Sequence, residues 1–512
     1  MPTHWRRTAA MTAAALCLFS ASAWSRTVKT DSGALRGIEQ GGVHIYKSVP
    51  FAAPPLGDLR WRPPQPVSHW TGVRKADAFA PACLQTGVSM PGETPPPTSE
   101  DCLYLNIWAP AKKATQPLPV LVWIHGGGYT NGSASMPLYW GDALARRGII
   151  VVTIAYRLGP LGFLAHPELT AESQDKSSGN YGLLDQIAAL RWVQRNIAAF
   201  GGDSGRVTIA GQSAGAMAVS ILMASPAARG LFHRAIGQSG GLFEPLELAP
   251  QYLLANAEAD GRKYVDSLRA ESIAALRRRP AAELLNGAGR VGHPVIEPHV
   301  LPAPPYDAFV SGKYNAVPLL VGFNADEARA LVDVSKVEAA TFKTDIESSF
   351  GALPQTLMDT YLPDTDALAP QARLDFERDL RFGWDMWKWA RLNSVHGSTY
   401  FYRFAQSPPF PETSVRHGWG ASHFAELWYM FDHLDQENWS WSERDRKVSA
   451  LMANYWTHFV KTGNPNGQGL PQWPTFESGN AMHFLNGATV GEVPGTERLE
   501  IFDATYDAVR RH

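Results

Sequence analysis

The stretch VTIAGQSAGA, residues 207–216, decides the fold of this chain. Its first four residues are apolar or β-branched and predict a buried strand, whereas the small residues from Ala214 onward predict a helix that packs tightly. Between strand and helix lies the pattern Gly-x-Ser-x-Gly, in which a serine sits on a sharp turn and the flanking glycines avoid a clash. We therefore expect Ser213 to be a nucleophile presented by a strand–turn–helix unit.

The same five-residue pattern occurs again as GQSGG, residues 237–241. A strand is predicted immediately before it, but the glycines and the proline that follow leave no helix to complete the turn. The local context therefore favours Ser213 as the nucleophile. It indicates that Ser239 is a strand-end residue or lies in the layer behind the site.

Apolar runs rich in β-branched residues alternate with helical patterns beyond this stretch, which is typical of a mostly parallel sheet flanked by helices. Strands are predicted at residues 119–124, 149–156, 206–210, 234–237, 318–322 and 399–404, and helices at residues 183–196 and 214–224. Residues 250–298 and 330–393 are helical and irregular, and we expect them to form insertions over the active site. Short strands before Pro117 are expected to form a small N-terminal sheet on the same body. The prediction is a single α/β domain over residues 24–512.

The composition argues against two classes of protein. Of the 512 residues, 45% are hydrophobic and 18% are charged, as in folded globular proteins and unlike disordered chains. The formal net charge is −2 and no long run of basic residues is present, so a nucleic-acid partner is not expected.

The first 23 residues have the pattern of a secretory signal peptide. Arg6 and Arg7 precede an apolar stretch at residues 11–19 that is too short to span a bilayer, and Ala-Ser-Ala at residues 21–23 offers a cleavage site. We predict an exported protein, periplasmic or secreted, whose mature chain starts near Trp24; an uncleaved membrane anchor is the alternative. No later segment offers the roughly 20 uninterrupted apolar residues of a membrane span, so stable membrane insertion is not expected.

Two of the three cysteines, Cys83 and Cys102, remain once the signal peptide is removed. In an oxidising compartment such a pair favours a disulfide, which here would close a loop rich in proline and glycine. In the chain-entropy model a closure of this size stabilises the fold by roughly 3 kcal/mol. Two unpaired buried thiols are the alternative.

The sequence HGGG, residues 125–128, directly follows a predicted strand and matches a loop motif of esterases and lipases. Glycine lets the backbone approach a substrate closely and turn its N–H groups inward. We expect the amides of Gly127, Gly128 and Ala214 to form an oxyanion hole. A flexible surface turn is the alternative interpretation of the three glycines.

A serine nucleophile needs a base to accept its proton and a carboxylate to orient that base. In a fold with this nucleophile turn, the chain order is serine, then Asp or Glu, then histidine. Asp326 and Glu327 follow one predicted strand, and His417 and His423 lie in a glycine-containing loop after the next one. Position alone leaves both pairs open.

Five motifs lie in order along the chain: PFAAPPLGDLRWRPP (residues 50–64), EDCLYLN (100–106), NYGLLDQIAALRWVQRNIAAFGGD (180–203), VTIAGQSAGA (207–216) and KTGNPNG (461–467). With them the chain resembles the type-B carboxylesterases, the cholinesterase-related group of the α/β-hydrolase fold. The resemblance covers nearly the whole mature length. Because so many separate motifs occur in the family's order, the match is specific.

The resemblance decides between the open pairs. It implies that the acid is Glu327, the last residue of GFNADE, and that the base is His423 in GASHFAEL. The chain departs from the family pattern at Gln212, where the family usually has glutamate, and at Ala328, where it usually has glycine. Neither departure removes a triad group, but the first changes the charge near His423.

The function that the resemblance implies is that of a carboxylesterase, which cleaves a small-molecule ester through an acyl-enzyme intermediate on Ser213. This chemistry calls for no metal and no organic cofactor. Two other classes of protein share the fold. A non-catalytic adhesion protein would have lost the triad, and a serine peptidase would share the nucleophile turn without the HGGG loop and the family motifs.

Overall fold

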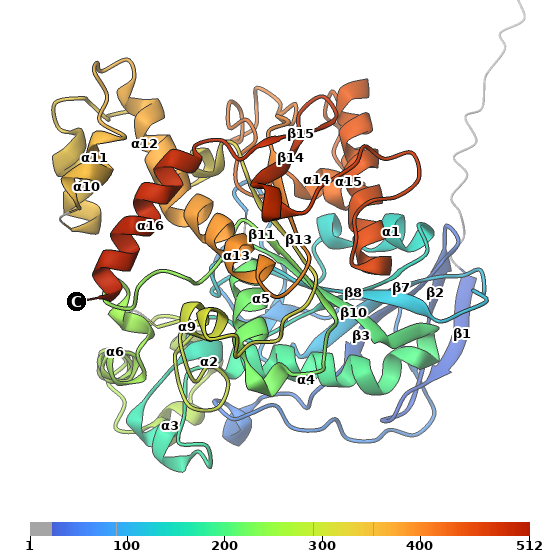
Figure 1. Ribbon diagram of the computed structural model, residues 1–512. Helices are drawn as coiled ribbons and strands as arrows, with labels where there is room; N and C mark the ends of the chain where they lie inside the picture. The colour runs from blue at the N-terminus through green and yellow to red at the C-terminus, as the bar shows by residue number, and fades with distance from the viewer. Residues whose placement is uncertain (1–22, 89, 290, 352, 512) are drawn as a thin grey trace, which may run out of the picture.

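The computed structural model describes residues 23–511, except residues 89, 290 and 352, and one large sheet runs through its centre (Figure 1). The strand order is β1-β2-β3-β7-β9-β8-β10-β11-β12-β13-β14-β15, and β4 pairs with β2. All neighbouring strands from β9 to β14 are parallel. This mainly parallel sheet with flanking helices confirms the predicted fold class.

The parallel part contains all six predicted strands. Its members are β8 (Leu118–Ile124), β9 (Ile150–Ile154), β10 (Gly202–Gln212), β11 (Arg234–Gln238), β12 (Leu319–Asn324), β13 (Thr399–Phe404) and β14 (Asn480–Phe484). The structure adds β14 and its antiparallel neighbour β15 (Ala488–Glu492), which the sequence did not indicate. No residue of β15 is buried, so this edge strand carries no run of apolar residues.

The N-terminal segment supplies short strands, as predicted. They are β1 (Ala23–Lys29), β2 (Ala34–Gln40), β3 (Val43–Pro50), β4 (Val73–Lys75) and β7 (Tyr104–Pro110). β7 pairs antiparallel with both β3 and β9, so the small N-terminal sheet is continuous with the central one. A separate two-stranded sheet joins β5 (Ala82–Cys83) to β6 (Thr98–Ser99).

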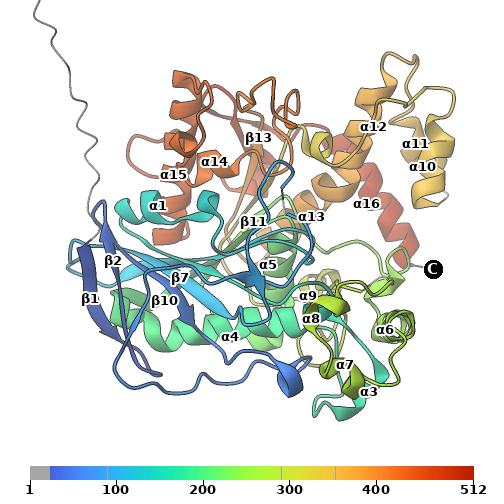
Figure 2. The same cartoon turned by 180° about the vertical axis from the view of Figure 1, so that it is seen from behind.

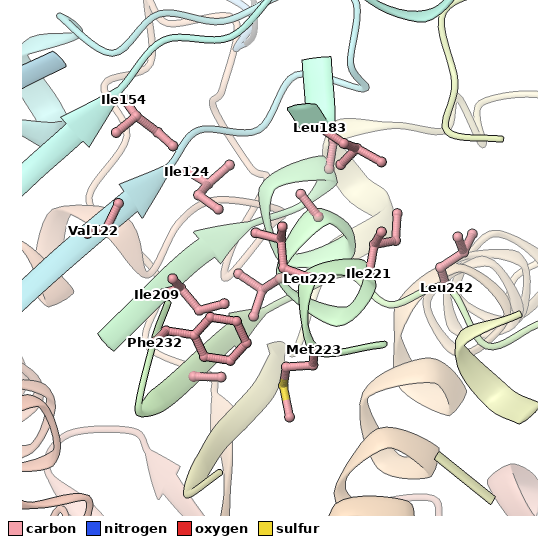
Figure 3. Close-up of a cluster of buried hydrophobic side chains, with 14 of the residues drawn as sticks. Val122, Ile124, Ile154, Leu183, Ile209, Ile221, Leu222, Met223, Phe232 and Leu242 are labelled. Atoms are coloured by element: carbon pink, nitrogen blue, oxygen red, sulfur yellow. The ribbon is translucent and has the colours of Figure 1, made fainter. Parts of the chain in front are cut away.

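Side chains of the central strands alternate between two hydrophobic cores, one on each face of the sheet. In β8, Val120 and Val122 belong to one core, and Leu121 and Trp123 belong to the other. The first core is covered by α4 (Tyr181–Asn196), α5 (Ala214–Ala224) and α13 (Trp384–Ser394), and the second by α1 (Asp142–Arg146), α14 (Leu427–Met430) and α15 (Glu443–Thr462). Figure 3 shows side chains of α5 packed on those of β8 and β10 in the first core.

The two irregular regions are helical, as predicted. The first contains α6 (Leu254–Ser267), α7 (Ile273–Arg277) and α8 (Ala281–Leu284), and the second contains α10 (Phe342–Phe350), α11 (Gln355–Asp359) and α12 (Ala369–Arg378). Figure 2 shows the second group standing apart from the sheet, next to the C-terminal helix α16 (Thr496–Arg510). The second region also supplies α13, whose Trp384 and Trp389 are part of the first core.

Cys83 and Cys102 form a disulfide, which confirms the predicted bridge. Both residues are buried, and the bond closes the loop that leaves β5 and returns before β7. The disulfide therefore holds a surface loop against the N-terminal part of the sheet.

We expect Cys83→Ser to lower the free energy of unfolding by roughly 3 kcal/mol, because the unfolded chain gains the freedom of the opened loop. Urea denaturation measures this loss. Cys102→Ser and the double variant should lose the same amount, since all three remove one bond. Different losses, or two free thiols in the unreduced unfolded protein, would contradict the expectation.

Most of the predicted signal peptide, residues 1–22, lies outside the described residues. None of the helices in the described part of the chain combines the length and the apolar character that crossing a membrane requires.

Candidate active site

Ser213 lies on the turn between β10 and α5, where its backbone has a φ of 56° and a ψ of −128°. A non-glycine residue rarely adopts a positive φ, and such a conformation costs on the order of 1–3 kcal/mol. The N–H of Ser213 donates to the carbonyl of Gln238 in β11 (2.9 Å), and its own carbonyl accepts the N–H of Ala216 in α5 (2.8 Å). These bonds hold the partly exposed serine at the C-terminal end of the sheet.

The two glycines of the turn lie where a side chain has no room. A Cβ atom at Gly211 would overlap the backbone of Gly215, and a Cβ atom at Gly215 would overlap the carbonyl of Ile124. Close packing between β8, β10 and α5 therefore requires glycine at both positions.

The HGGG loop begins where β8 ends and passes directly beside Ser213. A Cβ atom at Gly126 would lie 3.0 Å from the Cβ of Ser213. Gly127 and Gly128 have φ values of 106° and 60°, and their N–H groups have no hydrogen-bond acceptor among the described residues. The N–H of Ala214 opens α5 and belongs to the first turn, whose amides have no partner within the helix. Three amides are thus available around Ser213.

His125, the first residue of the HGGG loop, is held by contacts with Tyr156. Its ring is 1% exposed and stacks on Tyr156 with the ring centroids 4.4 Å apart. The Tyr156 hydroxyl donates to the carbonyl of His125 (2.8 Å). Burial lowers the pKa of His125 to about 4, so the ring is neutral at neutral pH. We infer that His125 is a packing residue and that the glycine amides face the site.

Glu327 and His423 form a buried hydrogen-bonded pair. His423 Nδ1 lies 2.7 Å from Glu327 Oε2, and the two residues are 4% and 0% exposed. The second carboxylate oxygen, Oε1, accepts the N–H of Asn324 at the end of β12 (2.6 Å). The contact with Glu327 favours the tautomer with hydrogen on Nδ1, which leaves a lone pair on Nε2.

Asp326 and His417, the alternatives to Glu327 and His423, lie outside this hydrogen-bonded pair. Asp326 Oδ2 accepts the N–H of Ala421 (2.9 Å), and the N–H of Asp326 donates to the carbonyl of the same residue (2.9 Å). Gly420 has a φ of 63°, and a Cβ atom there would overlap the Asp326 carboxylate. His417 is exposed. Of the four residues that position left open, the structure brings together Glu327 and His423, and Asp326 ties the histidine loop to β12.

Gln212 contacts the imidazole from the side of a ring face. Its Nε2 lies 3.1 Å from His423 Nε2 and 3.5 Å from His423 Nδ1, and the side chain is 3% exposed. Among the described residues, Ser213 Oγ has no hydrogen bond to His423. Catalytic hydrogen bonds are often long or absent before substrate binds. Transfer of the serine proton therefore requires the Ser213 hydroxyl to come within hydrogen-bonding distance of Nε2.

Ser239, in the second copy of the serine motif, is fully buried at the end of β11. Its N–H donates to the carbonyl of Gly322 in β12 (2.9 Å), and no α-helix follows until α6. The two serines thus differ in the way the local context predicted: of the two, only Ser213 opens a helix and is partly exposed.

Glu426 is a buried carboxyl behind the histidine that the sequence did not single out. Gln238 Nε2 donates to its Oε1 (2.9 Å), and Asn324 Nδ2 donates to its Oε2. Burial, with a further contribution from Glu327, raises the pKa of Glu426 to about 7. Asn324 therefore links two carboxyl groups, since its backbone N–H binds Glu327 and its side chain binds Glu426.

Phe382 covers one face of His423, and sequence analysis also missed it. The two rings are stacked with their centroids 4.5 Å apart and an interplanar angle of 19°. Phe382 belongs to a π-helical turn, Asp379–Gly383, between α12 and α13. Such turns are frequent at functional sites, but no residue pattern in the sequence indicates one.

Ser213, Glu327 and His423 thus follow β10, β12 and β13, which lie in one mainly parallel sheet with helices on both faces. This arrangement defines the α/β-hydrolase fold. The chain matches the Carboxylesterase family over residues 25–501.

Among characterised proteins, the chain is 38% identical to a fumonisin B1 esterase of Sphingopyxis macrogoltabida, over 91% of this chain and 87% of that protein. It is 36% identical to a cocaine esterase of Oryctolagus cuniculus, over 93% of this chain and 95% of that protein. Among solved structures, a PNB esterase superposes with a TM-score of 0.81 at 32% identity, covering 93% of this chain and 99% of that one. A carboxylesterase of Geobacillus stearothermophilus superposes with a TM-score of 0.80 at 33% identity, covering 94% and 99%. The chain belongs to the carboxylesterase family and is a carboxylic ester hydrolase.

Proposed function

We propose that the protein hydrolyses a small-molecule carboxylic ester through an acyl-enzyme intermediate on Ser213, with His423 as base and Glu327 as the orienting carboxylate. The observation that carries the proposal is the 2.7 Å contact between His423 and Glu327 at the end of the sheet where the partly exposed Ser213 lies. The relatives named as esterases of fumonisin B1 and of cocaine support a carboxylic ester as the substrate class.

In the proposed reaction, His423 Nε2 accepts the proton of Ser213 while the serine oxygen attacks the ester carbonyl. Glu327 holds the ring by Nδ1 and stabilises the imidazolium that forms. The amides of Gly127, Gly128 and Ala214 donate to the oxyanion as negative charge develops there. His423 then protonates the departing alcohol, and a water molecule repeats the sequence to release the carboxylic acid.

We also propose that residues 24–512 form a single catalytic domain that is exported to the periplasm or secreted. The disulfide between Cys83 and Cys102 supports this location, because such bonds persist in oxidising compartments.

Hydrolysis of a p-nitrophenyl ester, measured beside hydrolysis of a peptide p-nitroanilide, tests the proposed function. The ester is expected to be cleaved and the anilide to remain intact. Cleavage of the anilide at a comparable kcat/KM would favour a peptidase. No cleavage of short- or medium-chain esters by folded protein would favour a non-catalytic protein.

We expect Gln212→Glu to move the acid limb of the pH profile of kcat/KM to higher pH. Gln212 contacts His423 Nε2, and a carboxylate at that distance favours the protonated ring, which cannot act as a base. An opposite charge within about 4–6 Å commonly has an effect of about 1–3 pH units. The measurement is kcat/KM for a neutral ester between about pH 5 and 9, since the acid limb reports the free enzyme's base.

Gln212→Ala is the matched control for this prediction, because it removes the amide without adding charge. Its acid limb should lie closer to that of the wild type than the limb of Gln212→Glu does. A limb that stays in place in Gln212→Glu, or moves to lower pH, would show that residue 212 does not tune the base.

A further inference from the structure

Arg403 is a buried arginine that lies one residue before the end of β13. It is 7% exposed, and its guanidinium lies 4.4 Å from the ring centroid of Phe323, which is its neighbour in β12. Among the described residues, no carboxylate oxygen lies within 4 Å of the guanidinium. Buried charges in proteins are normally paired, so this arginine has a role that an ion pair does not explain.

The guanidinium of Arg403 binds the backbone where β12 ends. Its Nη1 donates to the carbonyl of Asn324 (2.6 Å), and its Nη2 donates to the carbonyl of Ala325 (3.2 Å). The N–H of Ala325 donates to the carbonyl of Phe404 in β13 (2.7 Å). The peptide group that joins Asn324 to Ala325 is therefore fixed on both sides, because Arg403 binds its oxygen and the next residue of β13 binds its N–H.

Asn324 is also the residue that binds the catalytic carboxylate. Its N–H donates to Glu327 Oε1 (2.6 Å), and Glu327 Oε2 lies 2.7 Å from His423 Nδ1. A chain of contacts therefore runs from Arg403 through Asn324 and Glu327 to His423. Displacing a catalytic group by about 1 Å can cost about 100-fold in rate. A residue that fixes the Asn324 backbone thus affects the reaction without touching the substrate.

Arg403 also provides positive charge near Glu327. Glu327 is 0% exposed, and among the described residues His423 is the one group that can form an ion pair with it. His423 is neutral whenever it is ready to accept a proton, and the buried carboxylate then has no cation in contact with it. Burial lowers the pKa of Arg403, and attraction to Glu327 opposes that shift. The same attraction favours the ionised form of Glu327.

The other charged groups around Arg403 are paired with one another. Arg378 and Asp379, where α12 meets the π-helical turn, form an ion pair in which Nε lies 2.7 Å from Oδ1. Asp326 forms an ion pair with Arg329, in which Nε lies 3.1 Å from Oδ1. Each pair contributes little net charge. The catalytic carboxylate is therefore the acid near Arg403 that has no permanent cation of its own.

Two further titratable groups, Tyr402 and Glu426, interact electrostatically with Glu327. Burial raises the pKa of Tyr402 well above its usual value, so its hydroxyl group stays neutral. Burial raises the pKa of Glu426 to about 7, so this group titrates in the range where the reaction would be measured. Because both groups are the same in all variants of residue 403, a difference between the pH profiles of such variants reports the change at that residue.

We propose that Arg403 is a positioning residue of the catalytic site, which holds Glu327 ionised and in place behind His423 through the backbone of Asn324. The proposal rests on the proposed triad and deepens it, because it adds a buried cation that determines at which pH His423 is free to act as a base. Among the described residues, Arg403 forms no hydrogen bond with the side chain of Ser213, Glu327 or His423, so it acts through the backbone and through its charge.

Arg403→Gln tests the proposal, because it removes the charge and leaves a side chain that can still donate to a carbonyl. The measurement is kcat and KM for a neutral ester between about pH 5 and 9. We expect kcat to fall roughly tenfold or more while KM stays within about twofold, since Glu327 is held less firmly and the substrate-binding surface is unchanged. The acid limb of kcat/KM should move to higher pH by about 1 unit, because losing a positive charge favours protonation of the Glu327–His423 pair.

Arg403→Lys separates the two effects, because it keeps the charge but replaces the planar fork with a single ammonium group. Its acid limb should stay within about 0.3 pH unit of the wild-type limb, and its kcat should lie between those of the wild type and of Arg403→Gln. Arg444→Gln is the matched control, since it makes the same change of charge at an exposed arginine of α15. It should leave both kcat and the acid limb in place.

A folded Arg403→Gln variant with the wild-type kcat or the wild-type acid limb would overturn the proposal, as would an equal displacement of the limb in Arg403→Lys. If Arg403→Gln does not fold, Arg403→Lys decides alone, and a wild-type kcat or a displaced limb in that variant overturns the proposal. Wild-type protein that cleaves no ester, or a fully active His423→Ala, would instead contradict the proposed triad, which keeps the two failures distinct.

Discussion

Ser213→Ala is expected to lower kcat for an ester by about 10⁶-fold, the size of loss found when the nucleophile of a serine hydrolase triad is removed. Without the hydroxyl no acyl-enzyme forms, and the remaining amides and binding surfaces give only a small acceleration over water. Ser213 is not fully buried and the change removes a single oxygen atom, so the variant should keep the wild-type fold. The measurement is kcat for ester hydrolysis by purified variant protein whose circular dichroism spectrum matches that of the wild type.

Ser239→Ala is the matched control, since it removes the serine of the second copy of the motif. Ser239 is fully enclosed at the end of β11, and a substrate has no access to it in this structure. We expect this variant to retain most of the activity. A large loss in Ser239→Ala with full activity in Ser213→Ala would reverse the assignment of the nucleophile.

His423→Ala is expected to lower kcat by about 10⁶-fold, and Glu327→Gln by about 10⁴-fold. The histidine carries the proton in both halves of the reaction, whereas the glutamate fixes the tautomer and stabilises the imidazolium through its 2.7 Å contact. Because the residues act as a unit, combining either change with Ser213→Ala should give little further loss. The measurement is single-turnover and steady-state hydrolysis of the same ester.

His417→Ala is the control for the histidine, because that side chain is exposed in the same loop. Its activity should lie near that of the wild type. An inactive His417→Ala beside an active His423→Ala would show that the pairing of His423 with Glu327 does not describe the working enzyme.

The strands and helices nearest the nucleophile were predictable because their signals are local. β13 and α5 have the predicted bounds, and the remaining predicted strands differ from the observed ones by a few residues at their ends. Buried parallel strands read as continuous apolar runs, and α5 is apolar or small throughout. β15 escaped prediction because none of its residues is buried and it has no such run.

The identity of the acid and base could not be predicted from local patterns. Asp326 and Glu327 are neighbours in sequence, and what separates them is a tertiary contact, the bridge between Asp326 and Ser422. That bridge turns Asp326 toward the backbone of Ala421 and leaves Glu327 facing the histidine. The resemblance to a known family named the pair, whereas the chain alone did not.

The residues that surround the His423 imidazole could not be predicted from the sequence either. Gln212 was singled out as a departure from the family pattern, but its 3.1 Å contact with His423 Nε2 depends on the loop brought in from after β13. Phe382 reaches the same ring through a π-helical turn, which results from how α12 meets α13 and leaves no signature in the residues. Local sequence patterns do not indicate contacts between segments that are far apart in the chain.

Labelling with a fluorophosphonate, followed by peptide mapping, tests the central claim most directly. The reagent forms a covalent bond with a serine only where a base removes its proton and amides stabilise the oxygen on phosphorus. We predict one label per chain, on the peptide that carries Ser213, and slow or no labelling in His423→Ala although Ser213 is still present. A label on Ser239, or equal labelling of the wild type and of Ser213→Ala, would contradict the account.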